Sequence, residues 1–406
     1  MDWQKLIDRL IKIFFTFMVS IGLIGGPTGT PNPTATATGT PSSTAAPHKS
    51  FTPTLEAATL QPAIFPTATI TPTLDPQSQR PEPGSVCGYD PLVENLMDDL
   101  NQDSWVNWIE LLSGEKPVHI NGETYTILTR YSEAMFSENP NARAYEFVLE
   151  QLRQWGYQDD LDLFEQAYQP FAPESNSTWK NIIVLIPGKD PDHAHEQILL
   201  TAHLDSISIG QPEEIAPGAD DNGSGVATLL EAARIFRGLE FKHTIKIVFF
   251  TGEELGLFGS KAYVSRYAHE LDDIVGVFNL DMFGYDGDKD RCFEIHVGWM
   301  PVSNQLGGCL ADIIEEYGVN LKFDYIVQEA ISASDHATFW QQGVGAIEVL
   351  ENYSTHGFPN GCGERDFNPY YHTDYDLIEN MNLDTGHTIA KAVIAAVARL
   401  AEISQD

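Results

Sequence analysis

The chain has 406 residues, a length that suits one large domain or two ordinary ones. Its 58 acidic and 23 basic residues give a formal net charge of −35 at pH 7. Because nucleic acids and anionic membrane surfaces attract basic patches, this charge argues against both as binding partners.

Residues 1–26 have the pattern of an export signal. Lys5, Arg9 and Lys12 precede a run of about a dozen apolar or small residues, as in the basic and apolar regions of a signal peptide. The run is shorter than the roughly 20 residues of a membrane-spanning helix, but no clear cleavage site follows it. We therefore expect a cleaved signal peptide or a membrane anchor through residues 10–26, with a disordered leader as the alternative. Export predicts an extracellular protein, secreted or tethered to the outer face of the cell membrane.

Residues 27–86 consist mainly of Thr, Pro, Ser and Ala. Such a segment has too little apolar area to offset the entropy of folding, and its prolines keep it extended. The sequence therefore predicts a disordered linker, followed by one folded domain over residues 87–406. The cysteines match no zinc-ribbon spacing, and in an exported protein they form up to two disulfides or stay free. Three pairings are open among Cys87, Cys292, Cys309 and Cys362.

Two helices are predicted at the start of the folded domain. Residues 91–112 repeat leucine and tryptophan at helical spacing. Residues 141–155 carry an apolar stripe, and Gly156 follows where a helix often ends in glycine. The aromatic side chains of both helices are assigned to the core.

Buried strands and helices alternate along the rest of the chain. The apolar runs at residues 181–186 and 197–205 are expected to form neighbouring strands joined by a turn. The later elements are a helix over 226–236, strands over 243–250, 274–281, 292–299 and 345–351, and helices over 310–317 and 385–403. This alternation predicts a single α/β domain with a mostly parallel central sheet and helices on both faces.

Side chains that bind metals follow these strands, at the edge of the sheet where ligands bind in open α/β folds. Five of them are predicted to be metal ligands: His203, Asp220, Glu254, Asp281 and His372. Asp205 follows His203 by two residues and suits an outer role, in which its carboxylate accepts the ring N–H of the histidine. A polar loop with a surface histidine is the alternative for this first motif. The remaining histidines, including His193 and His243, have no neighbouring ligand motif and are assigned to the surface or to packing.

Nitrogen and oxygen donors without thiolates suit Zn²⁺, with Mn²⁺ or Co²⁺ as substitutes. The charges of the set favour two ions. Three carboxylates carry −3, which two zinc ions and one hydroxide balance, whereas one zinc leaves the closed cleft negative. One carboxylate must then bridge the ions, and Asp220 is the candidate because it lies between the two half-sets in the sequence.

Glu253 is left without a metal in this scheme, because adjacent carboxylates rarely both reach one ion. A free carboxylate beside the metals can act as a general base on water. Metal ions lower the pKa of bound water from 15.7 to about 7 and polarise a carbonyl, so the set predicts hydrolysis of an amide bond. The alternative for Glu253 and Glu254 is an acidic pair that stabilises a helix N-terminus.

Five motifs occur in an order that is specific in combination: HLD, GADDNGSG, GEELGLFGS, NLDM and YYHTDYD. With them, and with TRYSEAM and NARAYEFVLEQLRQWG, the chain from Pro91 to the C-terminus resembles the co-catalytic di-zinc aminopeptidases secreted by bacteria. The resemblance implies a mixed sheet of about eight strands with helices on both faces. It also implies two zinc ions per chain and the removal of N-terminal residues from peptide substrates.

The resemblance also assigns roles to residues. One zinc is expected at His203 and Asp281, and the other at Glu254 and His372, with Asp220 as the bridging ligand and Glu253 as the base. In such families the bridging aspartate is followed by a cis peptide bond, which here would join Asp220 to Asp221; Asp221 is assigned to the outer shell.

Three further residues are weaker candidates. Tyr371 precedes His372, where a phenol can stabilise an oxyanion, or it is simply a packed aromatic residue. The segment ASDHATFWQQG resembles one that lines the substrate cleft of the family, so Asp335 and His336 are candidate substrate-binding residues, with a structural role as the alternative.

Other functions within and beyond the family stay open. One is a glutaminyl-peptide cyclotransferase with a single zinc, and another is a carboxypeptidase acting on acidic dipeptides. A third is an inactive surface-binding homologue, which we expect to lack ligands. Neither the preferred N-terminal residue nor the oligomeric state follows from the motifs.

Overall fold

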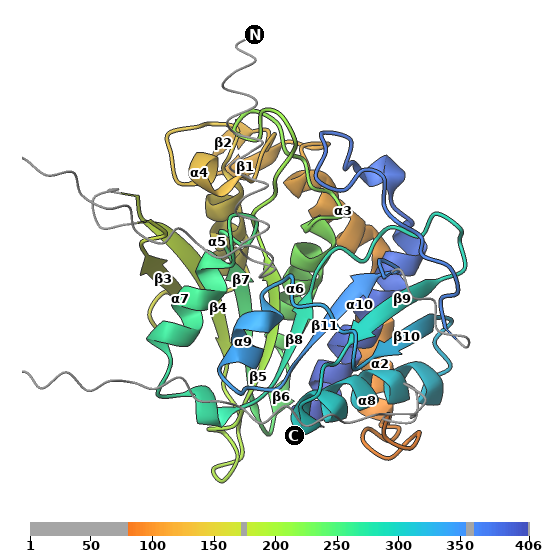
Figure 1. Ribbon diagram of the computed structural model, residues 1–406. Helices are drawn as coiled ribbons and strands as arrows, with labels where there is room; N and C mark the ends of the chain where they lie inside the picture. The colour runs from red at the N-terminus through yellow and green to blue at the C-terminus, as the bar shows by residue number, and fades with distance from the viewer. Residues whose placement is uncertain (1–79, 172–176, 355–360, 405–406) are drawn as a thin grey trace, which may run out of the picture. The chain divides into compact units, whose positions relative to one another are not determined.

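The computed structural model describes residues 80–171, 177–354 and 361–404 (Figure 1). Its main feature is an eight-stranded sheet with the strand order β10-β9-β11-β8-β5-β7-β4-β3. The strands are β3 (Leu163–Tyr168), β4 (Trp179–Ile186), β5 (Gln197–His203), β7 (Thr244–Phe250), β8 (Ile274–Leu280), β9 (Cys292–His296), β10 (Lys322–Ile326) and β11 (Ala346–Glu351).

The sheet is mixed, as expected. The pairings β5–β7, β5–β8, β8–β11 and β9–β10 are parallel, whereas β3–β4, β4–β7 and β9–β11 are antiparallel. The prediction of a mixed α/β sheet is therefore confirmed.

One predicted pairing is wrong. β4 and β5 are consecutive in the chain but not neighbours, because β7 lies between them. The loop from β4 to β5 passes the start of β7 and is bonded to Thr244. The Thr244 Oγ1 accepts the Gly188 N–H at 2.9 Å, and the Thr244 N–H donates to the Glu196 carbonyl at 3.0 Å.

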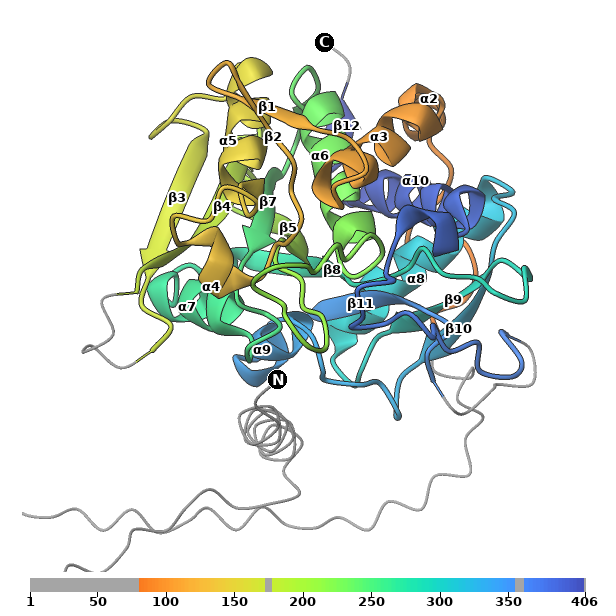
Figure 2. The same ribbon diagram turned by 90° about the horizontal axis from the view of Figure 1, so that it is seen from above.

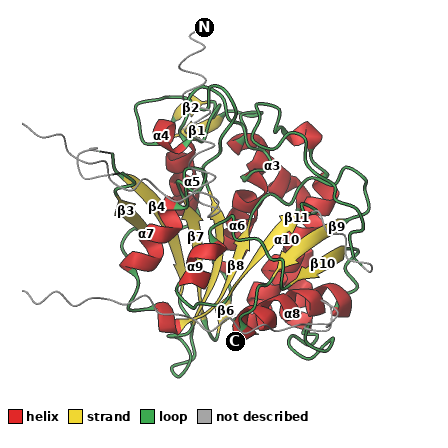
Figure 3. Ribbon diagram, in the orientation of Figure 1, coloured by secondary structure: helices red, strands yellow, loops and turns green. Residues whose placement is uncertain are grey.

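Helices cover both faces of the sheet (Figures 2 and 3). One face packs against α2 (Pro91–Asp99), α3 (Gln102–Leu112), α5 (Ala144–Gln154), α6 (Gly223–Phe236), α8 (Pro301–Glu316) and α10 (Leu383–Leu400), and the other against α7 (Phe258–Arg266) and α9 (His336–Gln341). The smaller elements are β1 (Val118–Ile120), β2 (Glu123–Tyr125), α4 (Ser132–Met135), β6 (Glu240–Phe241), η2 (Leu271–Asp273), η3 (Ile378–Asn380) and β12 (Ile403–Ser404).

The central strand β5 shows why a continuous apolar run forms such a sheet. All of its residues are buried, and successive side chains point to opposite faces. Ile198 and Leu200 enter the larger core, whereas Leu199 enters the core beneath α7 and α9. Full burial of a leucine or isoleucine contributes about 1.5–3 kcal/mol, so β5 is held from both sides.

The helix predicted over residues 91–112 is two helices. Leu100 is extended after α2, and the Asn101 side chain then caps α3 by accepting the N–H groups of Asp103 and Ser104. An asparagine at this position satisfies backbone donors that the first helical turn leaves free, so it starts a new helix.

The folded part begins before the predicted boundary at residue 87. The Arg80 guanidinium pairs with Glu315 at 2.7 Å, and the Asp312 carboxylate accepts the N–H groups of Gly84 and Val86. Residues 80–86, assigned to the linker, therefore contact α8. The predicted signal or anchor at residues 1–26 and the linker over 27–79 lie outside the described residues.

The cysteines form two disulfides, Cys87–Cys309 and Cys292–Cys362, which resolves the three pairings left open by the sequence. Within the described ranges, no helix has both the length and the hydrophobicity to cross a membrane.

Candidate active site

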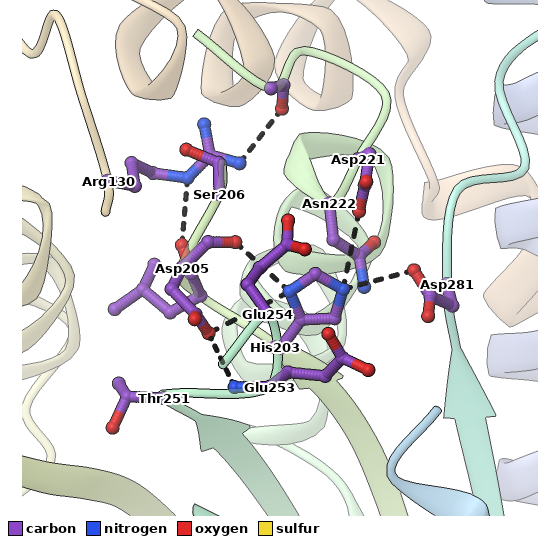
Figure 4. Close-up of polar contacts among 12 residues, drawn as sticks. Arg130, His203, Asp205, Ser206, Asp221, Asn222, Thr251, Glu253, Glu254 and Asp281 are labelled. Atoms are coloured by element: carbon purple, nitrogen blue, oxygen red, sulfur yellow. Dashed lines mark hydrogen bonds and ion pairs between the residues drawn. The ribbon is translucent and has the colours of Figure 1, made fainter. Parts of the chain in front are cut away.

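Predicted ligands meet at the carboxyl ends of the parallel strands (Figure 4). His203 ends β5, Asp281 follows β8, and Glu253 and Glu254 lie in the loop after β7. The N-terminus of α6 adds Asp221 to the same place.

Two sets of donor atoms face each other across Asp221. The His203 Nε2 lies 3.0 Å from the Asp281 Oδ1 and 3.4 Å from the Asp221 Oδ1. The His372 Nε2 lies 2.9 Å from the Glu254 Oε2 and 3.3 Å from the Asp221 Oδ2. Asp221 thus presents one oxygen to each histidine, which is the arrangement of a carboxylate shared by two metal ions.

The donor set fits zinc in geometry and in charge. For zinc bonds of about 2.0–2.2 Å, two ligand atoms of a tetrahedral site lie about 3.3 Å apart, close to each separation above. The buried Glu254 Oε1 has no hydrogen-bond partner within the described part of the chain. Buried carboxylates are costly unless they are paired or bind metals, so cations at this position would satisfy the set.

The predicted bridging role of Asp220 is wrong, because this side chain turns away from the histidines. Its Oδ1 accepts the Gly284 N–H at 2.7 Å, and its Oδ2 accepts the Asn368 side-chain amide at 3.3 Å. Burial raises the pKa of Asp220 to about 6. Asp221, assigned to the outer shell, is instead the aspartate whose carboxylate faces both histidines. The cis peptide bond is likewise one residue later than predicted, between Asp221 and Asn222.

Asp376 and Arg130 hold the turn that presents Asp221, and neither was a predicted site residue. The Asp376 carboxylate accepts the N–H groups of Asp220 and Asp221, each at 3.0 Å. The buried Arg130 guanidinium donates to the carbonyls of Leu204 and Gly218, both at 2.8 Å. The two residues lie in YYHTDYD and TRYSEAM, two of the sequence strings that carry the family resemblance.

Asp205 orients His203 differently from the prediction. The His203 Nδ1 donates to the backbone carbonyl of Asp205 at 3.0 Å, while the carboxylate Oδ1 is 3.8 Å away. That carboxylate instead accepts the Glu253 N–H at 3.2 Å. The carbonyl therefore places the hydrogen on Nδ1 and leaves Nε2 to face Asp281 and Asp221.

Glu253 is placed by an unusual backbone. Gly252, directly before it, has φ of +74°, and a Cβ there would lie 2.7 Å from the Trp179 ring, so only glycine fits. In Figure 4 the Glu253 carboxylate carries no dashed line, although its N–H is bonded. Burial, followed by the nearby Asp281 and Glu254 carboxylates, raises its pKa well above the usual value.

The electrostatics of the set follow from burial and from mutual proximity. Burial raises the pKa of Glu254 to about 7, and the neighbouring His372 offsets part of this shift. Burial alone would lower the pKa of His203, but the Asp281 and Asp221 carboxylates outweigh it and raise the pKa well above 6.5. These residues form a strongly coupled cluster with excess negative charge.

Left-handed backbone occurs at or beside several of these residues. φ is +56° at His372, +39° at Met282, which follows Asp281, and +59° at Leu257 in the loop after Glu254. Non-glycine residues adopt this conformation only where the surrounding structure enforces it, and such positions cluster at functional sites.

Tyr371 stacks on His372, with ring centroids 3.8 Å apart. Burial and then the Asp221 and Glu254 carboxylates raise the pKa of its phenol well above 10, which keeps the hydroxyl protonated. This placement is compatible with the predicted oxyanion role, which stays a prediction.

Asp335 and His336 are fully buried. Burial raises the pKa of Asp335 to about 7 and lowers that of His336 to about 3. The His336 Nε2 donates to the Ile331 carbonyl at 2.9 Å, and its ring packs on Trp340. Their assignment as substrate-binding residues is therefore corrected to a supporting position under the site.

Known proteins are similar to this chain in sequence and in fold. Leucine aminopeptidase 1 of Trichophyton equinum is 33% identical over 238 residues, which cover 56% of this chain and 59% of the relative. The chain therefore spans less than two thirds of the length of this relative.

Two solved structures share the fold. The LapA aminopeptidase of Legionella pneumophila is 21% identical, with a TM-score of 0.59 over 78% of this chain and 76% of LapA. The glutaminyl cyclase of Porphyromonas gingivalis is 22% identical, with a TM-score of 0.53 over 74% of this chain and 99% of the cyclase. At these identities the likeness concerns the fold alone.

The motif resemblance is confirmed at the level of the family. Residues 181–397, more than half of the 406 residues, match one family model, and all five motifs lie within this range. The chain belongs to peptidase family M28.

Proposed function

We propose that the protein is an extracellular, zinc-dependent aminopeptidase that removes N-terminal residues from peptides. One zinc ion would be held by His203 and Asp281, and a second by Glu254 and His372. Asp221 would be shared between them. The observation that carries the proposal is the position of Asp221, whose two carboxylate oxygens face the two histidines at 3.4 and 3.3 Å.

When bound, the two ions supply a water of lowered pKa and polarise the scissile carbonyl. Glu253 accepts the proton of the attacking water and passes it to the leaving amine. Its position suits this role because its backbone N–H donates to the Asp205 carboxylate at 3.2 Å, which fixes the residue beside His203 (Figure 4). Tyr371 keeps its proton and donates a hydrogen bond to the oxyanion that develops on the substrate.

Membership of peptidase family M28 and the likeness to a leucine aminopeptidase support the reaction class. The fold likeness to a glutaminyl cyclase does not favour the cyclase reaction. A shared carboxylate between two histidine half-sets favours two ions rather than the single zinc expected of that branch. Histidine nitrogens and carboxylate oxygens suit Zn²⁺, with Mn²⁺ or Co²⁺ as substitutes.

Two disulfides support an extracellular location, because cytosolic thiols are kept reduced. The basic and apolar residues of segment 1–26 also support an extracellular location, because they have the pattern of an export signal. Peptides are the proposed substrates, and the net charge of −35 argues against nucleic acid as a partner.

The test compares the parent enzyme with Glu253→Gln. We expect both proteins to bind the same number of zinc ions per chain by elemental analysis, two of them in the active site, and we expect kcat for aminoacyl amides to fall about 10²–10⁴-fold in the variant, the range of general acid–base catalysis. A panel of amides with different first residues reports specificity in the same assay.

Unchanged turnover in Glu253→Gln would remove this residue from the mechanism. Parent protein that binds zinc but releases no free amino acid would overturn the aminopeptidase assignment, and one tightly bound zinc with cyclisation of an N-terminal glutamine would replace it.

A further inference from the structure

A second cluster of metal-binding side chains lies at the opposite end of the sheet. His193 and Glu196 stand in the loop from β4 to β5, and His243 directly precedes β7. One ligand atom from each of these three residues lies within 4.8 Å of the others. The spacing of the three in the sequence had given no such indication.

The distances match those of a metal site. The Glu196 Oε2 is 3.1 Å from the His193 Nδ1 and 2.8 Å from the His243 Nδ1. The first contact has the distance of a hydrogen bond and is also close to the separation of about 3.3 Å expected between ligands of a tetrahedral zinc ion, whereas the second is shorter. Both distances are also similar to the separations between histidine and carboxylate atoms in the candidate active site.

The hydrogen bonding of His243 is incomplete without a cation. Its Nδ1 is buried and has no hydrogen-bond partner of acceptable geometry within the described residues, although the Glu196 oxygen is only 2.8 Å away. A ring nitrogen and a carboxylate oxygen at this distance need a proton or a metal ion between them. Because the position of the Glu196 oxygen relative to the His243 ring does not meet the geometry of a hydrogen bond, a metal ion bound by both atoms accounts better for their short separation.

A carboxylate behind His243 sets the direction of the ring. The Glu402 Oε1 lies 3.4 Å from the His243 Nε2 and accepts the Lys242 ammonium at 3.0 Å. Metal-binding histidines usually donate their other ring N–H to a carboxylate, which fixes the tautomer and raises the basicity of the free nitrogen. Glu402 therefore leaves the His243 Nδ1 lone pair directed at the cluster.

The backbone holds the three residues before any ion binds. The Thr244 N–H donates to the Glu196 carbonyl at 3.0 Å, and the Thr244 Oγ1 donates to the Ala194 carbonyl at 2.7 Å. The loop is thus bonded to the start of β7, next to His243. A metal site held in this way loses little conformational entropy when it fills.

We propose that His193, Glu196 and His243 form a binding site for a divalent transition-metal ion, of which Zn²⁺ best suits two imidazoles and one carboxylate. The side chains of His193 and Glu196 are 39% and 30% exposed, which leaves the fourth position of the ion to water. Seven residues of β5, at about 3.3 Å each, place the cluster roughly 23 Å from His203. The ion therefore clamps the β4–β5 loop to β7 and takes no part in the reaction at His203.

The experiment counts metal ions in variants of the whole protein. Parent protein, His193→Ala/His243→Ala and the control His269→Ala are dialysed against the same buffered free Zn²⁺ and analysed for zinc per chain. His269 is an exposed histidine 3.3 Å from Glu270, so it matches a surface histidine–glutamate pair outside the cluster. We expect the double variant to bind one zinc fewer than both other proteins, with unchanged hydrolysis of aminoacyl amides.

A milder variant separates loss of the site from loss of the fold. Glu402→Gln keeps all three ligands, and we expect its affinity for this one zinc to fall about 10–100-fold, as for other partners of a metal-binding histidine. Equal zinc content in the parent and the double variant would overturn the proposal. Because the result is a difference of one ion between variants, it does not depend on how many ions the active site holds.

Discussion

The substitution Asp221→Asn is the most direct test of the active-site geometry. The Asp221 Oδ1 and Oδ2 lie 3.4 and 3.3 Å from the two histidines, so Asp221→Asn removes an anionic donor from both half-sets at once. It also turns an amide N–H₂ towards one of the ring nitrogens. Changes to groups behind a metal ligand already cost 10–100-fold in affinity, so loss of a shared ligand is expected to cost more than about 100-fold. This corresponds to more than about 2.7 kcal/mol.

Asp220→Asn is the matched control, because it makes the same chemical change one residue earlier. The asparagine oxygen can still accept the Gly284 N–H, which the aspartate accepts at 2.7 Å. We expect this variant to keep both zinc ions of the active site, with affinity within about tenfold of the parent. The assay is competition for zinc with a chelating dye, followed by amide hydrolysis. Loss of zinc in Asp220→Asn and its retention in Asp221→Asn would refute the assignment of the bridging residue.

Three further predictions concern the residues around the site. Asp376→Asn removes a charged acceptor of two backbone N–H groups, so zinc affinity should fall about 10–100-fold in the dye assay. Little change in affinity would show that the turn keeps its position without this carboxylate. Arg130→Met removes the buried guanidinium that donates to four backbone carbonyls, so urea unfolding should show a loss of about 3 kcal/mol or more; a loss below 1 kcal/mol would contradict a structural role. Burial lowers the pKa of His336 to about 3, against about 6.5 in the unfolded chain, so the unfolded state gains the proton first as the pH falls. From pH 7 to pH 5 this should cost about 2 kcal/mol of stability in the parent at saturating zinc, and His336→Gln should show a shallower pH dependence by that amount.

The alternation of strands and helices could be predicted because the central strands are buried on both faces. β5 and β7 are continuous apolar runs of the kind that only a covered sheet accommodates. β3 and β10 were not predicted, since edge strands carry exposed residues and lack that signal. The insertion of β7 between β4 and β5 depends on a loop bonded to Thr244, a contact that local periodicity does not contain.

The site could be located because its residues follow strands that end at one edge of the sheet. The choice between Asp220 and Asp221 failed, because the direction of a side chain in a tight turn depends on backbone angles that residue spacing does not report. Arg130 and Asp376 were missed for another reason. Arg130 bonds to backbone groups 18 to 88 residues away in the chain and Asp376 to groups more than 150 residues away, so no neighbouring residue indicates their role.

The disulfide between Cys87 and Cys309 has a mechanical consequence. Cys309 lies within α8, which packs beneath β8 and β11, so tension on the chain before Cys87 passes through a covalent bond into the middle of the domain. The ion pair between Arg80 and Glu315 lies before Cys87 in the chain, so it is stretched before the disulfide. Its loss removes no contact within the sheet. Helices α2 and α3, which follow Cys87 in the chain, are bypassed. A force applied from the N-terminal side is therefore transmitted to the whole of α8. The strands that carry the metal-binding residues are not detached from the sheet one by one.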